Sequence, residues 1–524
     1  MKKQPASPFT RRLPKPVRAL FALALALPIF AATAATPTPP QASVHPLLLE
    51  AATHDPARLV DIIVLKSART DSPDRLVQSL GGTVTQQLGM INAFAAQIPA
   101  GAISRLAQAG NIRSISPDAP VHETGSPSAC SQCIPTTNLV SAYPQAVGAT
   151  RLWNAAPYLQ GQGVTVAVVD SGINGSHQDL QAANGTTRVV VNKEFGESTN
   201  TGDGYGHGTH VAGIIGGDGD RSNGGYIGIA PKVNLINVKI SDDAGNIRES
   251  DVIAGLEWIY NNRAAHNIKV VNISLTSSVY NLYHLSPIDA AVEILWFNRI
   301  VVVVSAGNNG IAALNPPAND PFVITVGAVD DRGTPAISDD RVASYSAYGP
   351  IIGGLNLLKP DLVAPGSNMV SALASTNAVI YRDHATHRVN DHYFRMSGTS
   401  MAAPVVAGAV ALLLQDEPNL NPDQVKYRLK QTANRNLLQW NYNILKAGSG
   451  YLDVYAAVRG STTQTANTGQ LASLLLWSGQ TPPLWGSTTW TSVNWSSVNW
   501  SSVNWSSVNW SNGTWGGDDW SLLP

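Results

Sequence analysis

The sequence predicts an α/β fold, a three-layer sandwich with a mainly parallel sheet, preceded by a small α+β domain. After residue 146, short apolar runs rich in β-branched residues alternate with helical segments, a pattern typical of parallel strands covered on both faces. Before it, residues 55–122 show a compact β-α-β-β-α-β order, the size of a small independent domain. A chain of 524 residues is long enough for both.

The elements of the sandwich follow from periodicity and from start and stop signals. Five apolar runs are predicted strands, at 164–169, 233–240, 270–275, 300–304 and 322–329. Five segments have helical character, at 207–215, 250–266, 287–298, 400–415 and 423–433. The last of them begins with Asn421-Pro422-Asp423, which supplies a helix cap, a first-turn proline and an acidic first turn.

In the smaller domain, strands are predicted at 59–65, 83–87, 92–98 and 112–115, and helices at 74–80 and 102–110. The stretch before it, from residue 37, is interpreted as a spacer. The first 35 residues combine basic side chains, an apolar run and the small-residue pattern Ala32-Thr33-Ala34, which together predict an export signal. We therefore expect a secreted or cell-surface protein.

Composition excludes several classes of partner. Only 13% of the residues are charged and the formal net charge is −1, which gives no electrostatic reason to bind nucleic acid. The two cysteines, Cys130 and Cys133, cannot form a zinc site alone, and as a redox motif they are weak. In an exported chain they favour a small local disulfide.

The tail at 460–524 carries tryptophan at every fifth position from 485 to 520. A period of five fits neither a helix nor one face of a strand. Two interpretations stay open: a disordered low-complexity extension, or an aromatic array that binds a glycan or a surface.

Three residues suggest catalysis. Ser400 stands where a glycine-bearing loop enters a predicted helix, so free backbone amides and the helix dipole favour an anion beside its hydroxyl. Pro404 is expected in the first helical turn, where a missing N–H costs little. Asp170 ends a predicted buried strand, at the sheet edge where α/β folds place their sites. His207 enters another helix and could act as a general base.

Each of the three has a plainer explanation. Ser400 could be a helix cap, Asp170 a turn former, and His207 a satisfied core histidine or a metal ligand together with His210. The metal alternative lacks a carboxylate-rich third and fourth ligand.

The surrounding motifs resemble the subtilases, the subtilisin-like serine peptidases. The matching stretches are 166–173, 207–213 and 398–404, supported by 305–308, 343–346 and 359–366, and the order Asp, His, Ser is the one found in that family. The resemblance implies an endopeptidase with Ser400 as nucleophile, His207 as general base and Asp170 as its partner. It also implies that Asn308 donates to the oxyanion.

The resemblance extends to substrate binding and maturation. It implies that Ser274, Leu275, Thr276 and Gly307 contact the peptide substrate, with Thr276 replacing the glycine usual in the family and narrowing the main specificity pocket. The domain at 36–125 resembles a propeptide that assists folding and inhibits until it is cleaved from the catalytic domain at 126–459. Such a zymogen would have its own propeptide as a partner.

No cofactor is expected to be required, although calcium is possible as a structural ion. Asp179 matches a family aspartate that often binds calcium, and Asp218, Asp220 and Asn223 in the loop 216–225 could complete an oxygen cage. A solvated acidic loop is the alternative.

Two other functions stay open. One is a surface-binding protein on an inactive peptidase scaffold, with the tryptophan tail contacting a cell surface or polysaccharide. The other is a transpeptidase or peptide ligase, because an amine can replace water in attacking an acyl-enzyme.

Overall fold

The computed structural model describes residues 42–68, 70–118, 132–196, 198, 202–351, 357–435, 443–476, 485 and 512–513. The chain divides into two compact units, residues 1–128 and 129–524. The export signal and Cys130 lie outside the described residues.

The smaller unit is a five-stranded sheet in the order β1-β5-β2-β4-β3 with three short helices. Its elements are β1 Ser43–Val44, α1 Pro46–His54, β2 Leu59–Lys66, α2 Ser72–Ser79, β3 Thr83–Leu88, β4 Ala93–Pro99, α3 Ile103–Leu106 and β5 Ile112–Pro117. The predicted β-α-β-β-α-β order is present, and its core includes Ile62, Val64 and Phe94. Helix α1 lies in the stretch interpreted as a spacer, where His45 caps it and Pro46 fills its first position.

The larger unit is built on a mainly parallel sheet in the order β13-β12-β11-β10-β6-β8-β7, with β16 also paired to β12. Its strands are β6 Thr165–Asp170, β7 Val189–Glu194, β8 Asn234–Lys239, β10 Ile268–Ile273, β11 Val301–Ser305, β12 Ile324–Asp330, β13 Arg341–Val342 and β16 Leu362–Pro365. All five predicted runs are strands. The edge strand β7 was overlooked because its second half, Asn192-Lys193-Glu194, is polar.

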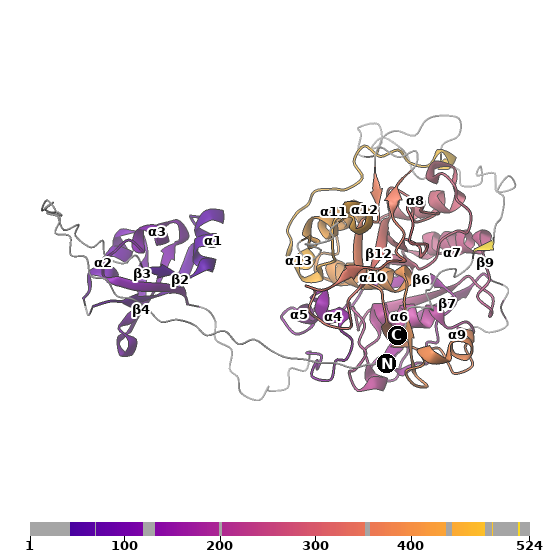
Figure 1. The fold of residues 1–524 in the computed structure, drawn as a ribbon, viewed down its shortest axis with the longest axis horizontal. Helices are drawn as coiled ribbons and strands as arrows, with labels where there is room; N and C mark the ends of the chain where they lie inside the picture. The colour runs from indigo at the N-terminus through magenta and orange to yellow at the C-terminus, as the bar shows by residue number, and fades with distance from the viewer. Residues whose placement is uncertain are drawn as a thin grey trace, which may run out of the picture. The chain divides into compact units, whose positions relative to one another are not determined.

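Helices cover this sheet in two layers (Figure 1). α6 (His207–Gly216) and α10 (Thr399–Asp416) pack on each other and on the strands, while α7 (Glu249–Asn262) and α8 (Pro287–Phe297) form a second pair. α11 (Pro422–Thr432) begins with the predicted cap, and Asn421 and Gln424 form a reciprocal capping box. This is the predicted three-layer fold.

The remaining elements of the larger unit are short. They are α4 Tyr143–Ala146, α5 Ala149–Trp153, β9 Ile247–Arg248, β14 Gly349–Pro350, β15 Leu358–Lys359, β17 Met369–Ala372, α9 Val379–Asp383, β18 Tyr393–Met396, α12 Ile444–Ala447, α13 Val454–Arg459 and β19 Asn512–Gly513. β19 pairs with β9 in antiparallel fashion. Among the helices described, α10 alone has the length and hydropathy of a membrane span, but it is the buried central helix of this unit.

Residues 461–476 and Trp485, which we call the strap, pack on the larger unit although the sequence places them in the tail. The Trp485 ring stacks on Phe297 with centroids 4.6 Å apart, and its indole N–H donates to Asp423. Asn467 donates to the same carboxylate at 2.8 Å, and the backbone N–H of Ser473 donates to Glu293 at 2.7 Å. The strap therefore supplies hydrogen-bond donors to side chains of α8 and α11. The other eight tryptophans of the tail, Trp477 and the seven that follow Trp485, lie outside the described residues.

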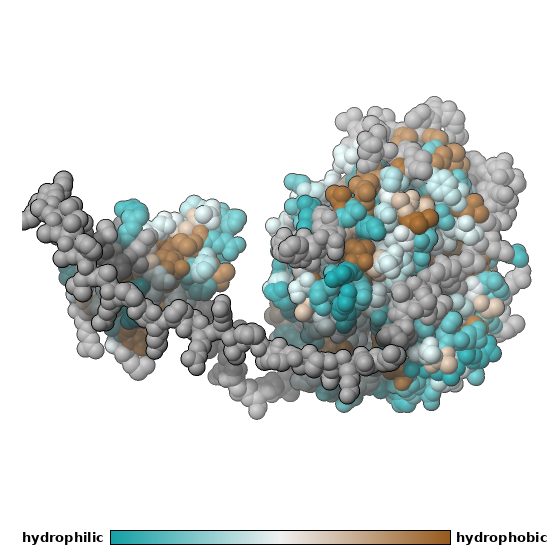
Figure 2. Space-filling model, viewed as in Figure 1, coloured by the Kyte–Doolittle hydropathy of each residue, from teal (hydrophilic) through white to brown (hydrophobic). Residues whose placement is uncertain are grey.

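The visible face of the larger unit shows small hydrophobic patches between hydrophilic side chains (Figure 2). Exposed large hydrophobic residues are scattered over the described surface, for example Val140, Tyr280 and Ile311. Single exposed apolar side chains such as Val140 and Ile311 are normal on a protein surface, whereas Val279 and Tyr280 form an exposed adjacent pair.

Three carboxyl groups are buried beside the strap. Asp289 and Glu293 on α8 and Asp320 before β12 are fully buried, and the Glu293 and Asp320 side chains lie within hydrogen-bond contact of each other. Burial raises the pKa of all three groups, and Asp320 raises the pKa of Asp289 and Glu293 further. The pKa of Asp320 rises to about 6. These three carboxyls therefore hold a proton to higher pH in the folded protein than in the unfolded chain.

This cluster should make the protein less stable in alkali. A carboxyl whose pKa is higher in the folded state contributes stability that is complete below about pH 4 and is lost as pH rises through the folded pKa, about 6 for Asp320. The parent for this test is Ser400→Ala, which prevents self-digestion. We expect the Tm of the parent to fall between pH 5 and pH 9, and we expect a smaller fall when Glu293→Gln is added to it. One kcal/mol corresponds to roughly 2–4 °C in a domain of this order of size.

The control is Glu257→Gln, which removes an exposed carboxylate from α7. The Tm of the Glu257→Gln variant should equal that of the parent at both pH values. An identical fall in Tm for Glu293→Gln and Glu257→Gln would contradict the assignment.

Candidate active site

Asp170 and His207 form a buried pair at the carboxyl edge of the parallel sheet. Asp170 ends β6, between β8 and β10, and His207 is the first residue of α6. Asp170 Oδ1 lies 2.8 Å from His207 Nδ1, and both side chains are at most 1% exposed. Because a carboxylate only accepts, His207 Nδ1 carries a proton, and in the neutral ring Nε2 then presents the lone pair. This is the tautomer that a general base requires.

The glycines around His207 permit this contact. Gly206 has φ +109°, a conformation that residues with a side chain rarely adopt. A Cβ on Gly208 would lie 2.2 Å from the Gly172 carbonyl oxygen and 2.8 Å from Asp170 Oδ1. No other residue type fits there without moving the pair apart.

Asp203 belongs to the candidate site and was not predicted from the sequence. Its buried carboxylate accepts from the Ser171 hydroxyl (2.8 Å), the Gly206 N–H (2.7 Å), and the N–H (2.8 Å) and hydroxyl (2.7 Å) of Thr209. These donors flank Asp170 and His207 in the chain. Asp203 therefore fixes the loop after Asp170 against the loop that carries His207. Only a glycine-rich neighbourhood marked it in the sequence.

His210, the alternative metal partner of His207, is committed elsewhere. Its Nε2 lies 3.0 Å from the Phe394 carbonyl and 3.1 Å from the Met369 carbonyl, so this nitrogen is a donor. Burial lowers the pKa of His210 to about 3, which keeps the ring neutral. The arrangement does not fit a His207–His210 metal pair.

Ser400 is the second residue of α10, which packs directly on α6. It is 6% exposed, and its hydroxyl donates to the Ser274 carbonyl at 3.2 Å. General-base contacts in resting enzymes often tighten only when substrate is bound. Its backbone N–H lies in the first helical turn, where amides have no intrahelical partner.

The expected place of Pro404 was wrong. α10 begins at Thr399, so Pro404 is its sixth residue and lies beyond the four N–H groups that need no partner. The proline removes the N–H that would normally bond the Ser400 carbonyl. That carbonyl accepts a hydrogen bond from the Ser274 hydroxyl at 3.0 Å instead.

Asn308 has a defined orientation beside Ser400. Its Oδ1 accepts from the backbone N–H of Thr399 at 2.8 Å and from the Thr399 hydroxyl at 2.9 Å. A backbone N–H can only donate, so the atom it meets must be the amide oxygen. These contacts use only the Asn308 oxygen and leave the NH₂ group available as a donor, the group that an oxyanion contact requires.

The predicted substrate edge lies next to these groups. Ser274 and Leu275 are buried, and Thr276 follows half-buried. The Gly307 N–H donates to the Thr399 hydroxyl at 3.0 Å, and a Cβ on Gly307 would lie 3.7 Å from the Thr276 methyl. Thr276 and Gly307 thus face each other beside Ser400.

Asp179 does not fit a calcium site. Its Oδ1 accepts from the Arg221 N–H at 2.8 Å and its Oδ2 from the Tyr393 hydroxyl at 2.7 Å, so protein donors satisfy both oxygens. Asp218 accepts from the backbone of Asp220. Within the described ranges, no three His, Cys, Asp or Glu side chains are grouped to hold a metal.

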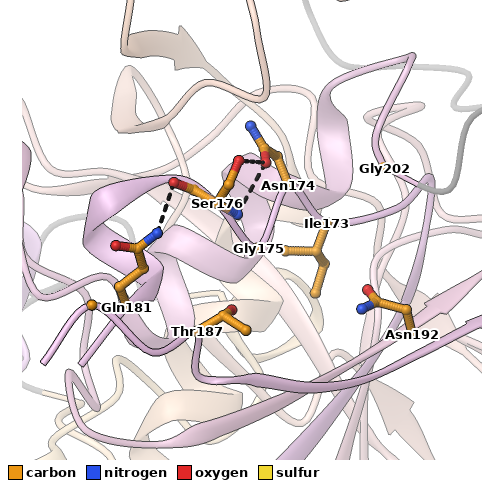
Figure 3. A pocket seen from close by; sticks show the side chains of 9 residues that line it. Ile173, Asn174, Gly175, Ser176, Gln181, Thr187, Asn192 and Gly202 are labelled. Carbon is orange, nitrogen blue, oxygen red and sulfur yellow. Dashed lines mark hydrogen bonds between the residues drawn. The ribbon is translucent and has the colours of Figure 1, made fainter.

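A cavity of about 460 Å³ adjoins the loop that follows Asp170 (Figure 3). Ile173, Thr187 and Asn192 turn toward it, while Ser176 bonds Asn174 and accepts from Gln181. It contains none of the predicted catalytic residues. Cys133 is disulfide-bonded, as expected for the pair of cysteines.

Comparison with known proteins places this chain in a family. A model of the subtilase family matches residues 161–458. Serine protease AprX of Bacillus subtilis (strain 168) is 42% identical over 284 residues, 53% of this chain and 62% of AprX. Subtilisin NAT of Bacillus subtilis subsp. natto is 31% identical over 393 residues, 73% of this chain and 85% of its own length.

Among solved structures, fervidolysin from Fervidobacterium pennivorans aligns over 81% of this chain and 64% of its own, with 25% identity and a TM-score of 0.47. The family match covers more than half of the chain, so the chain belongs to the subtilase family. It is a subtilisin-like serine endopeptidase.

Proposed function

We propose that the chain is an exported endopeptidase that hydrolyses peptide bonds through Ser400 and is made as a self-processed zymogen. The single observation that carries the proposal is the buried Asp170–His207 pair, which fixes the imidazole tautomer beside the helix bearing Ser400. A scaffold that had lost activity would have no need to keep this tautomer.

The reaction follows from these positions. His207 Nε2 takes the proton of the Ser400 hydroxyl as its oxygen attacks the scissile carbonyl, and Asp170 balances the imidazolium. The same nitrogen then protonates the leaving amine, and the C–N bond breaks to give the acyl-enzyme. Water, deprotonated by His207, attacks the acyl-enzyme, and the serine departs with that proton.

The negative charge of each tetrahedral intermediate meets two donors, the Asn308 NH₂ group and the Ser400 backbone N–H. Thr399 holds Asn308 before substrate arrives, so little reorganisation is needed during reaction. Facing Gly307, the Thr276 side chain would restrict the adjacent specificity pocket, and we propose that substrates with small side chains at the cleaved bond are preferred.

The nucleophile can be tested by covalent labelling. A small organophosphorus fluoride should phosphonylate the protein once, and peptide mapping by mass spectrometry should place the adduct on Ser400. Denatured protein is the control, because labelling needs the assembled site. An adduct at another serine would overturn the assignment.

The zymogen proposal rests on the separate unit before residue 129, which carries its own core. Cleavage between residues 119 and 147 is expected to release it, and the released piece should inhibit the mature enzyme. Secreted protein that begins near residue 35 and is fully active would contradict this.

For the tail, we propose retention on an insoluble polymer, with the tryptophans after Trp485 as contacts that add avidity. Because the strap belongs to the catalytic unit, the test is a version ending at residue 486, with cleavage of small peptides as the control. This shortened protein should cleave small peptides normally and should no longer be retained on cell walls.

A transpeptidase can be distinguished from a peptidase by adding amines to the reaction. In a transpeptidase, the amines would capture more of the acyl-enzyme than water does.

A further inference from the structure

The helix that carries Ser400 has a defect at the nucleophile itself. In a regular α-helix the Ser400 carbonyl would accept from the N–H four residues later, which is residue 404. That residue is proline, which has no N–H. The backbone of the nucleophile therefore lacks the hydrogen bond that would hold it in the helix.

The Ser274 hydroxyl occupies the vacated position. It donates to the Ser400 carbonyl at 3.0 Å and accepts from the side-chain NH₂ of Asn272 at 2.9 Å. Both directions are fixed, because a carbonyl cannot donate and an amide NH₂ cannot accept. Ser274 and Asn272 are at most 1% exposed, so water does not compete for this chain of hydrogen bonds.

Ser274 also meets the nucleophile through its backbone. Its carbonyl accepts from the Ser400 hydroxyl at 3.2 Å, so one residue contacts both ends of Ser400. β10 ends at Ile273, one residue before Ser274, which ties these contacts to the central sheet.

We propose that the Ser274 side chain is a positioning residue that fixes the backbone of the nucleophile by replacing the hydrogen bond that Pro404 removes. This rests on the proposed role of Ser400 and extends it. Without the hydroxyl, Ser400 would sample more positions relative to His207, and its reactivity would fall without loss of the substrate contact made by the Ser274 backbone.

The test is a double-mutant cycle that uses Pro404. Ser274→Ala should lower the rate constant for phosphonylation of Ser400 by a small organophosphorus fluoride about tenfold, the effect of losing one hydrogen bond. The reagent contains no peptide, so its labelling rate reports the reactivity of Ser400 without any contribution from peptide binding. In a Pro404→Ala background the helix regains its own N–H donor, and the same substitution should cost less than about threefold.

Turnover of a peptide p-nitroanilide should show the loss in kcat with KM nearly unchanged. Ser274→Thr, which keeps the hydroxyl, should restore kcat. If Ser274→Ala does not fold, Ser274→Cys takes its place, and its weak donor should give an intermediate kcat. The matched control is Ser371→Ala, which removes another buried serine hydroxyl that donates to a helix carbonyl, that of His210, at 2.8 Å. Its labelling rate should stay within about twofold of the parent.

Equal effects of Ser274→Ala in the parent and in the Pro404→Ala background would overturn the positioning role while leaving Ser400 as the nucleophile. Failure of the unmodified enzyme to label at Ser400 would overturn both.

Discussion

Ser400→Ala is expected to lower kcat for peptide hydrolysis by roughly 10⁶-fold, because a triad that loses its nucleophile loses covalent catalysis altogether. The fold should be preserved: removing one oxygen from a 6% exposed serine leaves α10 packed as before. Initial rates on a fluorogenic peptide, together with the Tm of the variant, measure both. The protein should also fail to process itself.

The matched control is Ser397→Ala, three residues earlier. Ser397 is 7% exposed and accepts a hydrogen bond from the Asn368 N–H at 2.9 Å. Its loss should lower stability slightly and leave kcat within a few fold. Residual cleavage by Ser400→Ala at more than a thousandth of the parent rate, insensitive to organophosphorus fluorides, would mean that another group attacks the substrate.

Asp170→Asn is expected to lower kcat about 10⁴-fold with little change in KM. The amide can donate to His207 Nδ1 where the carboxylate could only accept, and this would place the imidazole proton on Nε2, the nitrogen that must take the serine proton. The imidazolium would also lose its counter-charge. Steady-state kinetics on the same peptide separate the two parameters.

Asp179→Asn is the control for this change. It alters another buried carboxylate on the segment after β6, one with two protein donors. We expect a lower Tm and a nearly normal kcat. Equal losses of kcat in both aspartate variants would point to a general loss of packing instead of a tautomer effect.

Much of the fold could be predicted because parallel strands buried on both faces leave continuous apolar runs. All five such runs in the larger unit are strands. The edge strand β7 and the helix α1 were missed, since neither has a continuous apolar run that is buried on all sides. Strand and helix boundaries differed by a few residues.

The candidate site also contains residues that could be predicted from the sequence and residues that could not. Asp170, His207, Ser400 and Asn308 stand in distinctive local motifs, and the structure brings Asp170 to His207 and Asn308 to the start of α10. The roles of Asp203 and of the Ser274 hydroxyl were not predictable from local sequence. Asp203 joins its near neighbours Gly206 and Thr209 to Ser171, which lies 32 residues earlier. The Ser274 contact depends on the helix register around Pro404. The calcium expectation at Asp179 depended on which donors fold against it, and these are Tyr393 and Arg221.

The strap has a consequence for how the protein is made. Asp423 and Glu293 receive donors from Asn467, Ser473 and Trp485, all of which follow the last residue matched by the subtilase model. A growing chain on the ribosome presents those carboxylates and the Phe297 ring long before their partners have been synthesised. The final packing of α8 and α11 therefore has to wait until the strap has been synthesised. A recombinant version that ends at residue 459 would resemble a nascent chain that has not yet reached the strap.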